Sequence, residues 1–304
     1  MALYDYPPTG GNWKKYENNP ILGSPDVGTC FDIFMLPDED GLRMYFSWRP
    51  KKSLAVTTSN DGGETWGPLR IILEPKLETA WEDDLNRNCI VRVNGKYHMW
   101  YTGQARGYSY IGYATSADGF QFERQGGGMP VMIPERFWEN RSVMNPFVLW
   151  CDRENLFKMW YSAGETYEPN AIGYATSPDG LHWQKHPANP IFVHEPGNTY
   201  EQERIGGCQV VPTDEGYVIF YIGYEDIDTA RICVAQSPDG ITRWQRSRHN
   251  PIISPSEGEW DGHACYKPAV LYDRGTDTWR LYYNGRLHGA EYIGLATLQD
   301  GTLL

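Results

Sequence analysis

Short runs of β-branched and aromatic residues, separated by turn residues, follow one another along the whole chain. In one representative stretch such runs cover 145–150, 157–162 and 172–176, and a fourth begins at Leu181. Gly, Pro, Asp or Asn bound these runs, which is typical of strands joined by tight turns. No segment keeps the apolar period of about 3.6 residues that marks an amphipathic helix. The pattern therefore predicts an all-β chain.

A phrase close to Ile-Gly-Tyr-Ala-Thr-Ser-x-Asp-Gly occurs five times along the chain. Its aspartates are 57, 61, 60 and 61 residues apart, and they are Asp61, Asp118, Asp179, Asp239 and Asp300. A period this regular over a whole chain indicates a repeated supersecondary unit. Because the repeat covers nearly the whole chain, we expect residues 1–304 to form a single domain. Since each period holds four strand-like runs, the predicted fold is a five-bladed β-propeller with four-stranded antiparallel blades.

The two ends of the chain complement each other. Fourth strands carry a Trp…Asn-Pro-Ile motif at 183–191 and 244–252, whereas the fifth repeat stops at Gly301 without one. The N-terminus has a spare copy at 13–21, with the same spacing from Trp to Asn. We therefore expect an N-terminal strand, within residues 12–22, to complete the last blade and so cover an exposed strand edge.

The aspartate turns have a structural interpretation. Residues 59–66 match the S-x-D-x-G-x-x-W pattern that is called an Asp-box in sialidases. Asp and Gly build such turns through side-chain hydrogen bonds and positive φ angles, without any chemistry. These turns join strands three and four, so they should lie on the face opposite the loops that link one blade to the next.

Charge and composition exclude several classes of partner. The net charge of −12 at pH 7 argues against nucleic acid, whose phosphates need a basic surface. No stretch approaches the roughly 20 apolar residues of a membrane span, and the N-terminus lacks the regions of a signal peptide. We therefore expect a cytoplasmic protein with no nucleic-acid or membrane partner. A neutral sugar is compatible with this charge, and the sequence does not indicate the oligomeric state.

Candidate chemistry lies in the loops that lead into each inner strand, called leading loops below, and in the loops between strands two and three. In a propeller both kinds of loop emerge on one face near the axis. Carboxylates at or near the leading loops are candidate catalytic groups, namely Asp32, Asp84, Glu139, Glu203 and Asp261. Two carboxyl groups that flank a glycosidic bond can act as acid and base, and mutual crowding separates their pKa values.

Other polar residues of these loops are expected to bind substrate, namely Arg49, Arg87, Gln104, Asn145, Glu165, His263, Lys267 and Arg286. Any one of them taken alone can instead be a solvated charge or part of a salt bridge between blades. His263 can also be a hydrogen-bonded core histidine rather than a residue that holds a metal. We expect no metal and no cofactor.

The repeats resemble the five-bladed propeller glycosidases of glycoside hydrolase families 43, 32, 68, 117 and 130, over essentially the whole chain. The resemblance implies an Asp base or nucleophile at the start of blade one, which is Asp32. It also implies an Asp-Pro on blade three and a Glu at the start of blade four. Asn145 and Gly207 stand at those two places, and Glu203 lies four residues before Gly207. The family 130 pattern, Glu-Asp followed by Arg, is similar to residues 82–87 with a longer spacing.

The sequence therefore predicts a glycoside hydrolase that acts on small oligosaccharides or chain ends, with Asp32 as base and Glu203 as acid. Asp84, Glu139 and Asp261 are alternative carboxyl groups, and an inverting mechanism follows by analogy. A first alternative is a glycoside phosphorylase, in which a cationic cluster such as Arg49, Arg87, Arg141, Lys267 and Arg286 binds phosphate. A second alternative is a propeller that binds carbohydrate without catalysis.

Overall fold

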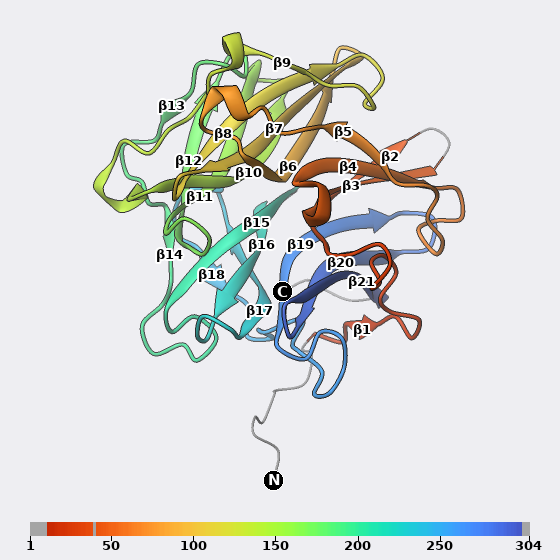
Figure 1. The fold of residues 1–304 in the computed structure, drawn as a ribbon. Coiled ribbons are helices and arrows are strands. Elements are labelled where there is room, and N and C mark those ends of the chain that lie inside the picture. The colour runs from red at the N-terminus through yellow and green to blue at the C-terminus, as the bar shows by residue number, and fades with distance from the viewer. Residues whose placement is uncertain (1–10, 39–40, 300–304) are drawn as a thin grey trace. The chain divides into compact units, whose positions relative to one another are not determined.

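The computed structural model describes residues 11–38 and 41–299, and this part of the chain is all-β (Figure 1). Within these residues there is no α-helix, and the only helical segments are short 3-10 turns. These turns are η1 (Arg49–Lys51), η2 (Leu77–Thr79), η3 (Gly126–Gly128) and η4 (Phe137–Glu139). The all-β prediction is confirmed.

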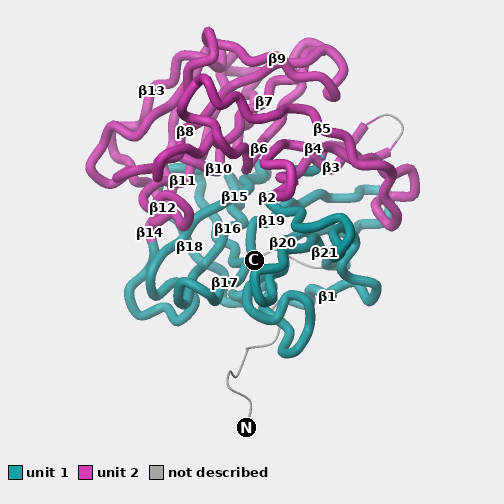
Figure 2. The backbone as a smooth tube through the Cα atoms, in the orientation of Figure 1, with its two compact units in different colours: residues 1–35, 194–304 teal, residues 36–193 magenta. Residues whose placement is uncertain are grey.

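The chain divides into two compact units, drawn in different colours in Figure 2. Unit 1 comprises residues 1–35 and 194–304, and unit 2 comprises residues 36–193. The division falls within strand β2 (Cys30–Asp38). Each unit is described by itself below.

Unit 2 contains three successive groups of antiparallel strands, which continue from β2 and are called repeats 1, 2 and 3. Repeat 1 has the strand order β2-β3-β4-β5, with β3 (Gly41–Trp48), β4 (Ser53–Ser59) and β5 (Arg70–Leu73). Repeat 2 has β6 (Asp84–Val93), β7 (Lys96–Ala105), β8 (Tyr108–Ser116) and β9 (Glu123–Arg124). Repeat 3 has β10 (Ser142–Cys151), β11 (Leu156–Gly164), β12 (Pro169–Ser177), β13 (Gln184–Lys185) and β14 (Phe192–Val193). One parallel bridge, Ser142 to Ser109, joins repeats 2 and 3 into a sheet.

Unit 1 contains two further groups, repeats 4 and 5, built in the same order. Repeat 4 has β15 (Arg204–Thr213), β16 (Gly216–Tyr224), β17 (Ala230–Ser237) and β18 (Gln245–Arg246). Repeat 5 has β19 (Ala264–Asp273), β20 (Thr278–Leu287) and β21 (Ala290–Gln299). Its fourth strand is β1 (Lys14–Lys15), which pairs antiparallel with β21. The predicted pairing of the N-terminal segment with the last repeat is therefore present.

The side-chain amide of the asparagine in each Asn-Pro-Ile motif makes the backbone hydrogen bonds that a paired strand residue would make. Asn19 Oδ1 accepts a hydrogen bond from Leu295 N at 2.8 Å, and Asn19 Nδ2 donates to Leu295 O at 2.9 Å. The side chain thereby satisfies both backbone groups of a third-strand residue beyond the point where the short fourth strand ends. The same arrangement joins Asn189 to Tyr174 and Asn250 to Val234.

The recurring phrase forms the third strand and the turn after it. Asp118 Oδ1 accepts backbone hydrogen bonds from Phe120 at 2.8 Å and from Gln121 at 3.0 Å. These bonds, led by that from Phe120, lower the pKa of Asp118. Equivalent bonds are made by Asp61, Asp179 and Asp239. They support the structural interpretation of these turns; Asp300 lies outside the described residues.

The glycine of the phrase leaves room for the aromatic residue of the leading loop. A Cβ atom on Gly173 would lie 2.7 Å from the Tyr161 ring and 2.8 Å from the Trp138 ring. Close contact between indole and backbone therefore requires glycine at this point. Repeat 4 carries Cys233 in the place of this glycine, and its leading loop has the smaller Tyr200 in the place of tryptophan.

Replacing Asn19 by alanine should destabilise the fold, because it removes two hydrogen bonds that attach the N-terminal segment to β21. At about 1 kcal/mol for each bond, the free energy of unfolding should fall by about 2 kcal/mol, measured by urea unfolding. Asn18→Ala is the matched control, since Asn18 is exposed and bonds only locally to Tyr16; its effect should stay within about 0.5 kcal/mol. Equal losses in the two variants would contradict the role given to Asn19.

Candidate active site

In repeats 2 to 5 a carboxylate of the leading loop is buried between a tyrosine hydroxyl and a cation. In repeat 3, Tyr161 Oη donates to Glu139 Oε1 at 2.8 Å, and Lys185 Nζ lies 2.8 Å from Glu139 Oε2. The tyrosine comes from the second strand and the cation from the fourth. The other three groups are Glu82–Tyr101–Arg124, Glu201–Tyr221–Arg246 and Asp261–Tyr283–Lys15. We call these four groups the buried triads.

In two of the triads, burial and hydrogen bonding shift the pKa of the carboxyl group in opposite directions. Burial would raise the pKa of Glu139, but bonds from Lys185 and from the backbone N–H groups of Glu135 and Arg136 lower it. Glu82 lacks those backbone donors, and burial raises its pKa despite Arg124. Each carboxylate thus has a structural role that needs no substrate. We therefore do not retain Glu139 and Asp261, two of the sequence-predicted carboxylates, in the catalytic set proposed below.

In each repeat, one residue near the start of the first strand has a left-handed backbone. These residues are Asp32 (φ 54°), Arg87 (φ 55°), Asn145 (φ 50°), Gly207 (φ 43°) and Lys267 (φ 51°). In β6, β10, β15 and β19 the pairing register shifts at this point, which identifies a β-bulge. Bulges turn a side chain away from the ladder and are frequent beside active sites. The positions that the family resemblance singled out on blades one, three and four all coincide with such points.

A polar side chain of the preceding repeat supports the backbone at several of these points. The N–H of Arg87 donates to Ser47 Oγ at 3.1 Å, and the N–H of Asn145 donates to Thr102 Oγ1 at 3.1 Å. In unit 1 the N–H of Asp32 donates to Asn284 Oδ1 at 3.2 Å. Since a left-handed conformation is unfavourable for residues other than glycine, these bonds help to hold it.

In unit 1, Asp32 belongs to a buried group that also contains Tyr266 and Glu291. Asp32 is 3% exposed, and the Tyr266 hydroxyl donates a hydrogen bond to Glu291 Oε1. Burial, then the charges of Glu291 and Asp32, hold the pKa of Tyr266 well above 10.0, while Arg286 opposes them. Tyr266 thus lies within electrostatic reach of two carboxylates. The sequence analysis missed Tyr266 and Glu291; the only signal was that Tyr266 precedes the bulge residue Lys267.

The other predicted residues of unit 1 are more dispersed. The Glu203 side chain is 46% exposed and pairs with the guanidinium of Arg204 at 3.2 Å. Arg286 Nη2 donates to the carbonyl of Asp228 at 2.8 Å, and Lys267 is buried. The His263 ring packs edge-on against the His288 ring, with 4.7 Å between centroids. Glu203 therefore differs from Asp32 in that its side chain is half-exposed and paired with a cation.

In unit 2, the charges of three cations act on Asp84. Burial raises the pKa of Asp84 above 3.8, although the charges of Arg49, Lys52 and Arg87 act in the opposite direction. Three positive groups around one carboxyl leave a local excess of positive charge in a protein whose net charge is −12. We call Arg49, Lys52, Asp84 and Arg87 the cationic cluster.

Two amide side chains extend this cluster. Arg87 Nη1 donates to Asn86 Oδ1 at 2.8 Å, and Asn86 Nδ2 donates to Gln104 Oε1 at 2.8 Å. Of the remaining predicted residues, Asn145 is buried and its Oδ1 has no hydrogen-bond partner within the described residues. The exposed Glu165 accepts a hydrogen bond from Asn140 Nδ2 at 3.3 Å.

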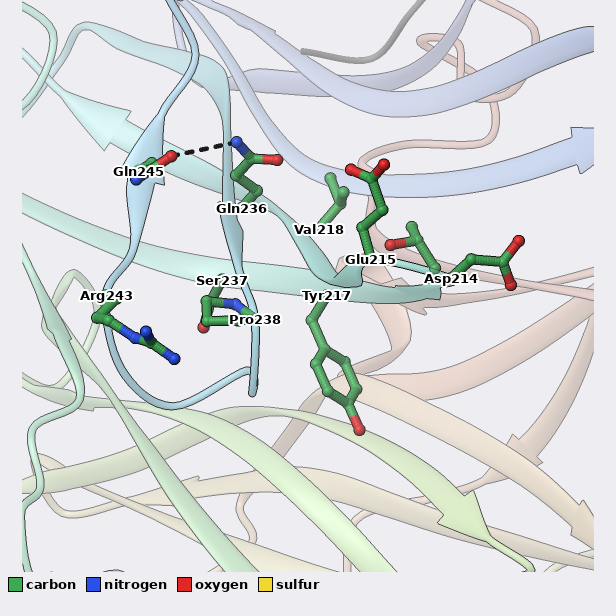
Figure 3. A pocket seen from close by; sticks show the side chains of 10 residues that line it. Asp214, Glu215, Tyr217, Val218, Gln236, Ser237, Pro238, Arg243 and Gln245 are labelled. Carbon is green, nitrogen blue, oxygen red and sulfur yellow. Dashed lines mark hydrogen bonds between the residues drawn. The ribbon is translucent and has the colours of Figure 1, made fainter.

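A cavity of about 850 Å³ lies where β15 ends, β16 begins and β17 ends, and Figure 3 shows its lining. Its polar residues include Asp214, Glu215 and Arg243, and Gln236 is hydrogen-bonded there to Gln245 at 3.3 Å. None of the sequence-predicted site residues lines it. The cavity lies near the end of β15, whereas the leading loop enters at the start of that strand.

Two further kinds of feature are absent from residues 11–38 and 41–299. No group of three or more His, Cys, Asp or Glu side chains is arranged there to hold a metal ion. No helix in those ranges has the length and apolar character that crossing a membrane requires.

Comparison with known sequences finds distant relatives, and no family model matches the chain. An uncharacterised protein of Mycobacterium tuberculosis strain H37Rv is 28% identical, with 86% of this chain and 89% of that protein covered. A 1,2-beta-oligomannan phosphorylase of Thermoanaerobacter sp. strain X514 is 27% identical, with 75% of this chain and 94% of that protein covered.

Comparison with solved structures shows the fold. A glycoside hydrolase matches with a TM-score of 0.76 at 17% identity, covering 93% of this chain and 92% of that one. A thermostable family-43 glycoside hydrolase matches with a TM-score of 0.73 at 16% identity, covering 93% and 94%. The beta-1,2-mannobiose phosphorylase of Listeria innocua, in complex with beta-1,2-mannobiose, matches at 0.70 and 15% identity, covering 95% and 97%.

The chain therefore shares the fold of the propeller glycoside hydrolases and phosphorylases. The resemblance drawn from the repeated motifs is therefore confirmed as a similarity of fold.

Replacing Glu139 by glutamine should act on stability. Breaking a buried ion pair lowers the free energy of unfolding by about 3–5 kcal/mol. Because the folded-state pKa of Glu139 is lowered, its contribution is complete above the ordinary value of 4.5 and is lost as the pH falls. Urea unfolding at several pH values should show that the gap between wild type and Glu139→Gln narrows below pH 4.5.

Glu135→Gln is the matched control for this variant. Glu135 Oε2 lies 3.1 Å from the same Lys185 ammonium, but the Glu135 side chain is 61% exposed. Loss of an exposed pair should change stability by about 1 kcal/mol or less. A Glu139→Gln protein that unfolds like the wild type would overturn the structural role of Glu139.

Proposed function

We propose that the protein is a carbohydrate-active enzyme that cleaves β-1,2-linked manno-oligosaccharides at their ends, with inorganic phosphate as the attacking group. The observation that carries this proposal is the cationic cluster, in which the charges of Arg49, Lys52 and Arg87 all act on the carboxyl of Asp84. The linkage is taken from the phosphorylase relative, which is 27% identical. The fold proposed with it is one domain over residues 1–304, whose five repeats are the blades of a five-bladed propeller.

Phosphate binding requires several donors of positive charge in fixed positions. Arginine forks pair with phosphate oxygens through two parallel hydrogen bonds, and lysine adds a point charge. In the cationic cluster one carboxyl balances only one of three cations, so a dianion would complete the neutralisation. A neutral sugar alone has no need of this charge, whereas phosphorolysis does.

The number of available carboxyl groups also favours phosphorolysis. An inverting hydrolase needs one carboxyl to protonate the leaving oxygen and another to activate water. The predicted second group, Glu203, is half-exposed and paired with Arg204. Phosphate is itself a nucleophile, so a single acid is sufficient; we assign that role to Asp84, which lies with the cationic cluster in unit 2 and whose pKa burial raises.

In this reaction a phosphate oxygen bonds to the anomeric carbon while the glycosidic C–O bond breaks. The leaving oxygen takes the proton of the Asp84 carboxyl, and the products are a glycosyl phosphate and a shortened saccharide. Solvent or the next phosphate returns a proton to Asp84. Of the other predicted residues of unit 2, Gln104, Asn145 and Glu165 are retained as candidate sugar-binding groups. His263, Lys267 and Arg286 of unit 1 are retained with Asp32 for the second candidate reaction.

Hydrolysis, the reaction expected from the sequence, is the second candidate. The observation in its favour is Glu291, a second buried carboxyl that shares Tyr266 as a neighbour with Asp32. In that case Glu291 rather than Glu203 would serve with Asp32 as the acid and base pair. An inverting course is proposed for both reactions.

The first test is cleavage of β-1,2-mannobiose and mannotriose with and without phosphate, followed by NMR of the products. We expect glycosyl phosphate only when phosphate is present, and an inverted anomeric configuration. Asp84→Asn should lower kcat by about 10²- to 10⁴-fold, because the acid is lost. Equal cleavage without phosphate would replace phosphorolysis by hydrolysis, and binding without any cleavage would indicate a carbohydrate-binding protein.

Arg49→Ala tests the phosphate site separately. The KM for phosphate should rise at least about tenfold, equivalent to about 1.4 kcal/mol, with little change in the KM for the sugar. Arg92→Ala is the matched control, because Arg92 lies exposed on β6, the strand that also carries Arg87. A phosphate KM that is the same in Arg49→Ala and Arg92→Ala would contradict the assignment of the cationic cluster.

A further inference from the structure

Two loops of unit 2 are bonded to each other beside the cationic cluster. One is the hairpin turn 105–108 between β7 and β8, and the other is the loop 165–168 between β11 and β12. The carbonyl of Thr166 accepts hydrogen bonds from Gln104 Nε2 at 3.0 Å and from Ser109 Oγ at 2.9 Å. The Thr166 hydroxyl donates to the carbonyl of Gly107 at 2.5 Å. The two loops therefore form one fixed rim.

This rim is attached directly to the cationic cluster. Arg87 Nη2 donates to the carbonyl of Tyr167 at 3.1 Å, while Nη1 of the same guanidinium bonds to Asn86. Asn86 in turn bonds to Gln104, which holds Thr166. A ligand bound at the cationic cluster would therefore have the rim as its immediate neighbour.

Two tyrosine rings stand exposed on the rim. Tyr167 is 65% exposed and Tyr108 is 42% exposed, although both come from backbone that is hydrogen-bonded in place. The Tyr108 ring stacks on Tyr110 at 6.2 Å, and Tyr110 meets Trp81 edge-on at 6.4 Å. The Tyr108 ring is thus held by Tyr110, which in turn packs against the buried Trp81. Exposed aromatic faces on a rigid support, next to convergent polar groups, are the usual wall of a ligand site.

We propose that Tyr108 and Tyr167 form a subsite for a further sugar ring of an oligosaccharide, one unit or more beyond the cationic cluster. This inference rests on the proposed function, because it takes the cluster as the place of bond cleavage. The apolar C–H face of a pyranose ring can cover an aromatic face, and the carboxylate of Glu165 offers an acceptor to its hydroxyl groups. Asn140 holds that carboxylate at 3.3 Å.

The occupant is identified as a neutral saccharide by the chemistry of the rim. The two rings carry no charge, and in the two loops the carboxylates of Glu165 and Glu168 outnumber the one cation, Arg106, which disfavours an anionic ligand. Tyrosine also loses little conformational entropy when it binds, since only two side-chain torsions are fixed. The subsite should therefore make the enzyme prefer chains of three or more sugars to a disaccharide.

The test is calorimetric binding of β-1,2-mannobiose and β-1,2-mannotriose to wild type, Tyr108→Ala and Tyr167→Ala. We expect wild type to bind the trisaccharide more tightly, and each variant to weaken its Kd by about two- to tenfold. The Kd of the disaccharide should not change. Tyr167→Phe should bind the trisaccharide like wild type, because the aromatic face is kept.

Tyr272→Ala is the matched control. Tyr272 is also 42% exposed, but it lies at the far end of β19, where its ring packs on Trp279 at 4.8 Å. Its replacement should leave both dissociation constants unchanged.

The outcomes separate this subsite from the proposed function. If wild type cleaves mannobiose and mannotriose but binds them equally, or if Tyr108→Ala and Tyr167→Ala bind the trisaccharide as wild type does, the subsite is wrong and the proposed function stands. If wild type cleaves neither saccharide but mannotriose affinity still depends on Tyr167, the proposed function fails and the subsite stands. If neither saccharide binds to wild type, both are overturned.

Discussion

Removing a carboxylate from water is the constraint on which each repeat depends. In four repeats the leading loop places such a group in the interior, with its side chain 0–1% exposed. A buried charge is tolerated only when a counter-ion and hydrogen bonds replace its lost hydration. The tyrosine of the second strand and the cation of the fourth strand do so, and the leading loop is thereby fastened across its own repeat. The direction of that loop, and of the inner strand after it, follows from this contact.

Repeat 1 departs from this arrangement. Its second strand carries Phe46 where the other repeats have Tyr101, Tyr161, Tyr221 and Tyr283, so no hydroxyl is available there. The leading loop of repeat 1 then leads to Asp32, which has a left-handed backbone and a buried side chain outside the four triads. One of the carboxyl groups that we propose for chemistry thus belongs to the repeat in which the structural pairing is missing. The triads thus have a structural role. The β-bulges, by contrast, turn side chains away from the strand pairing, and these side chains are available to a ligand.

The same left-handed position carries an acid in repeat 1, cations in repeats 2 and 5, an amide in repeat 3 and glycine in repeat 4. This mixture differs from the three carboxylates that the family resemblance implied. Arg87 at its bulge belongs to the cationic cluster, which points to an anionic reactant. The net charge of the protein gives no sign of this, because it averages over groups that are far from the site.

Sequence alone determined the strands, the period, the strand that pairs with the last repeat and the structural meaning of the aspartate turns. These depend on local patterns, namely apolar runs, turn residues and repeated Asn-Pro-Ile, which are read within a few residues. It also placed Asp32 at the start of the first inner strand. Only the tertiary structure showed that Glu139 and Asp261 are hydrogen-bonded to buried tyrosines, whereas the charges of three cations act on Asp84. The partners of Glu139 lie 22 and 46 residues away in the chain, so no local pattern reports whether such a carboxylate is neutralised by the fold or available to a substrate.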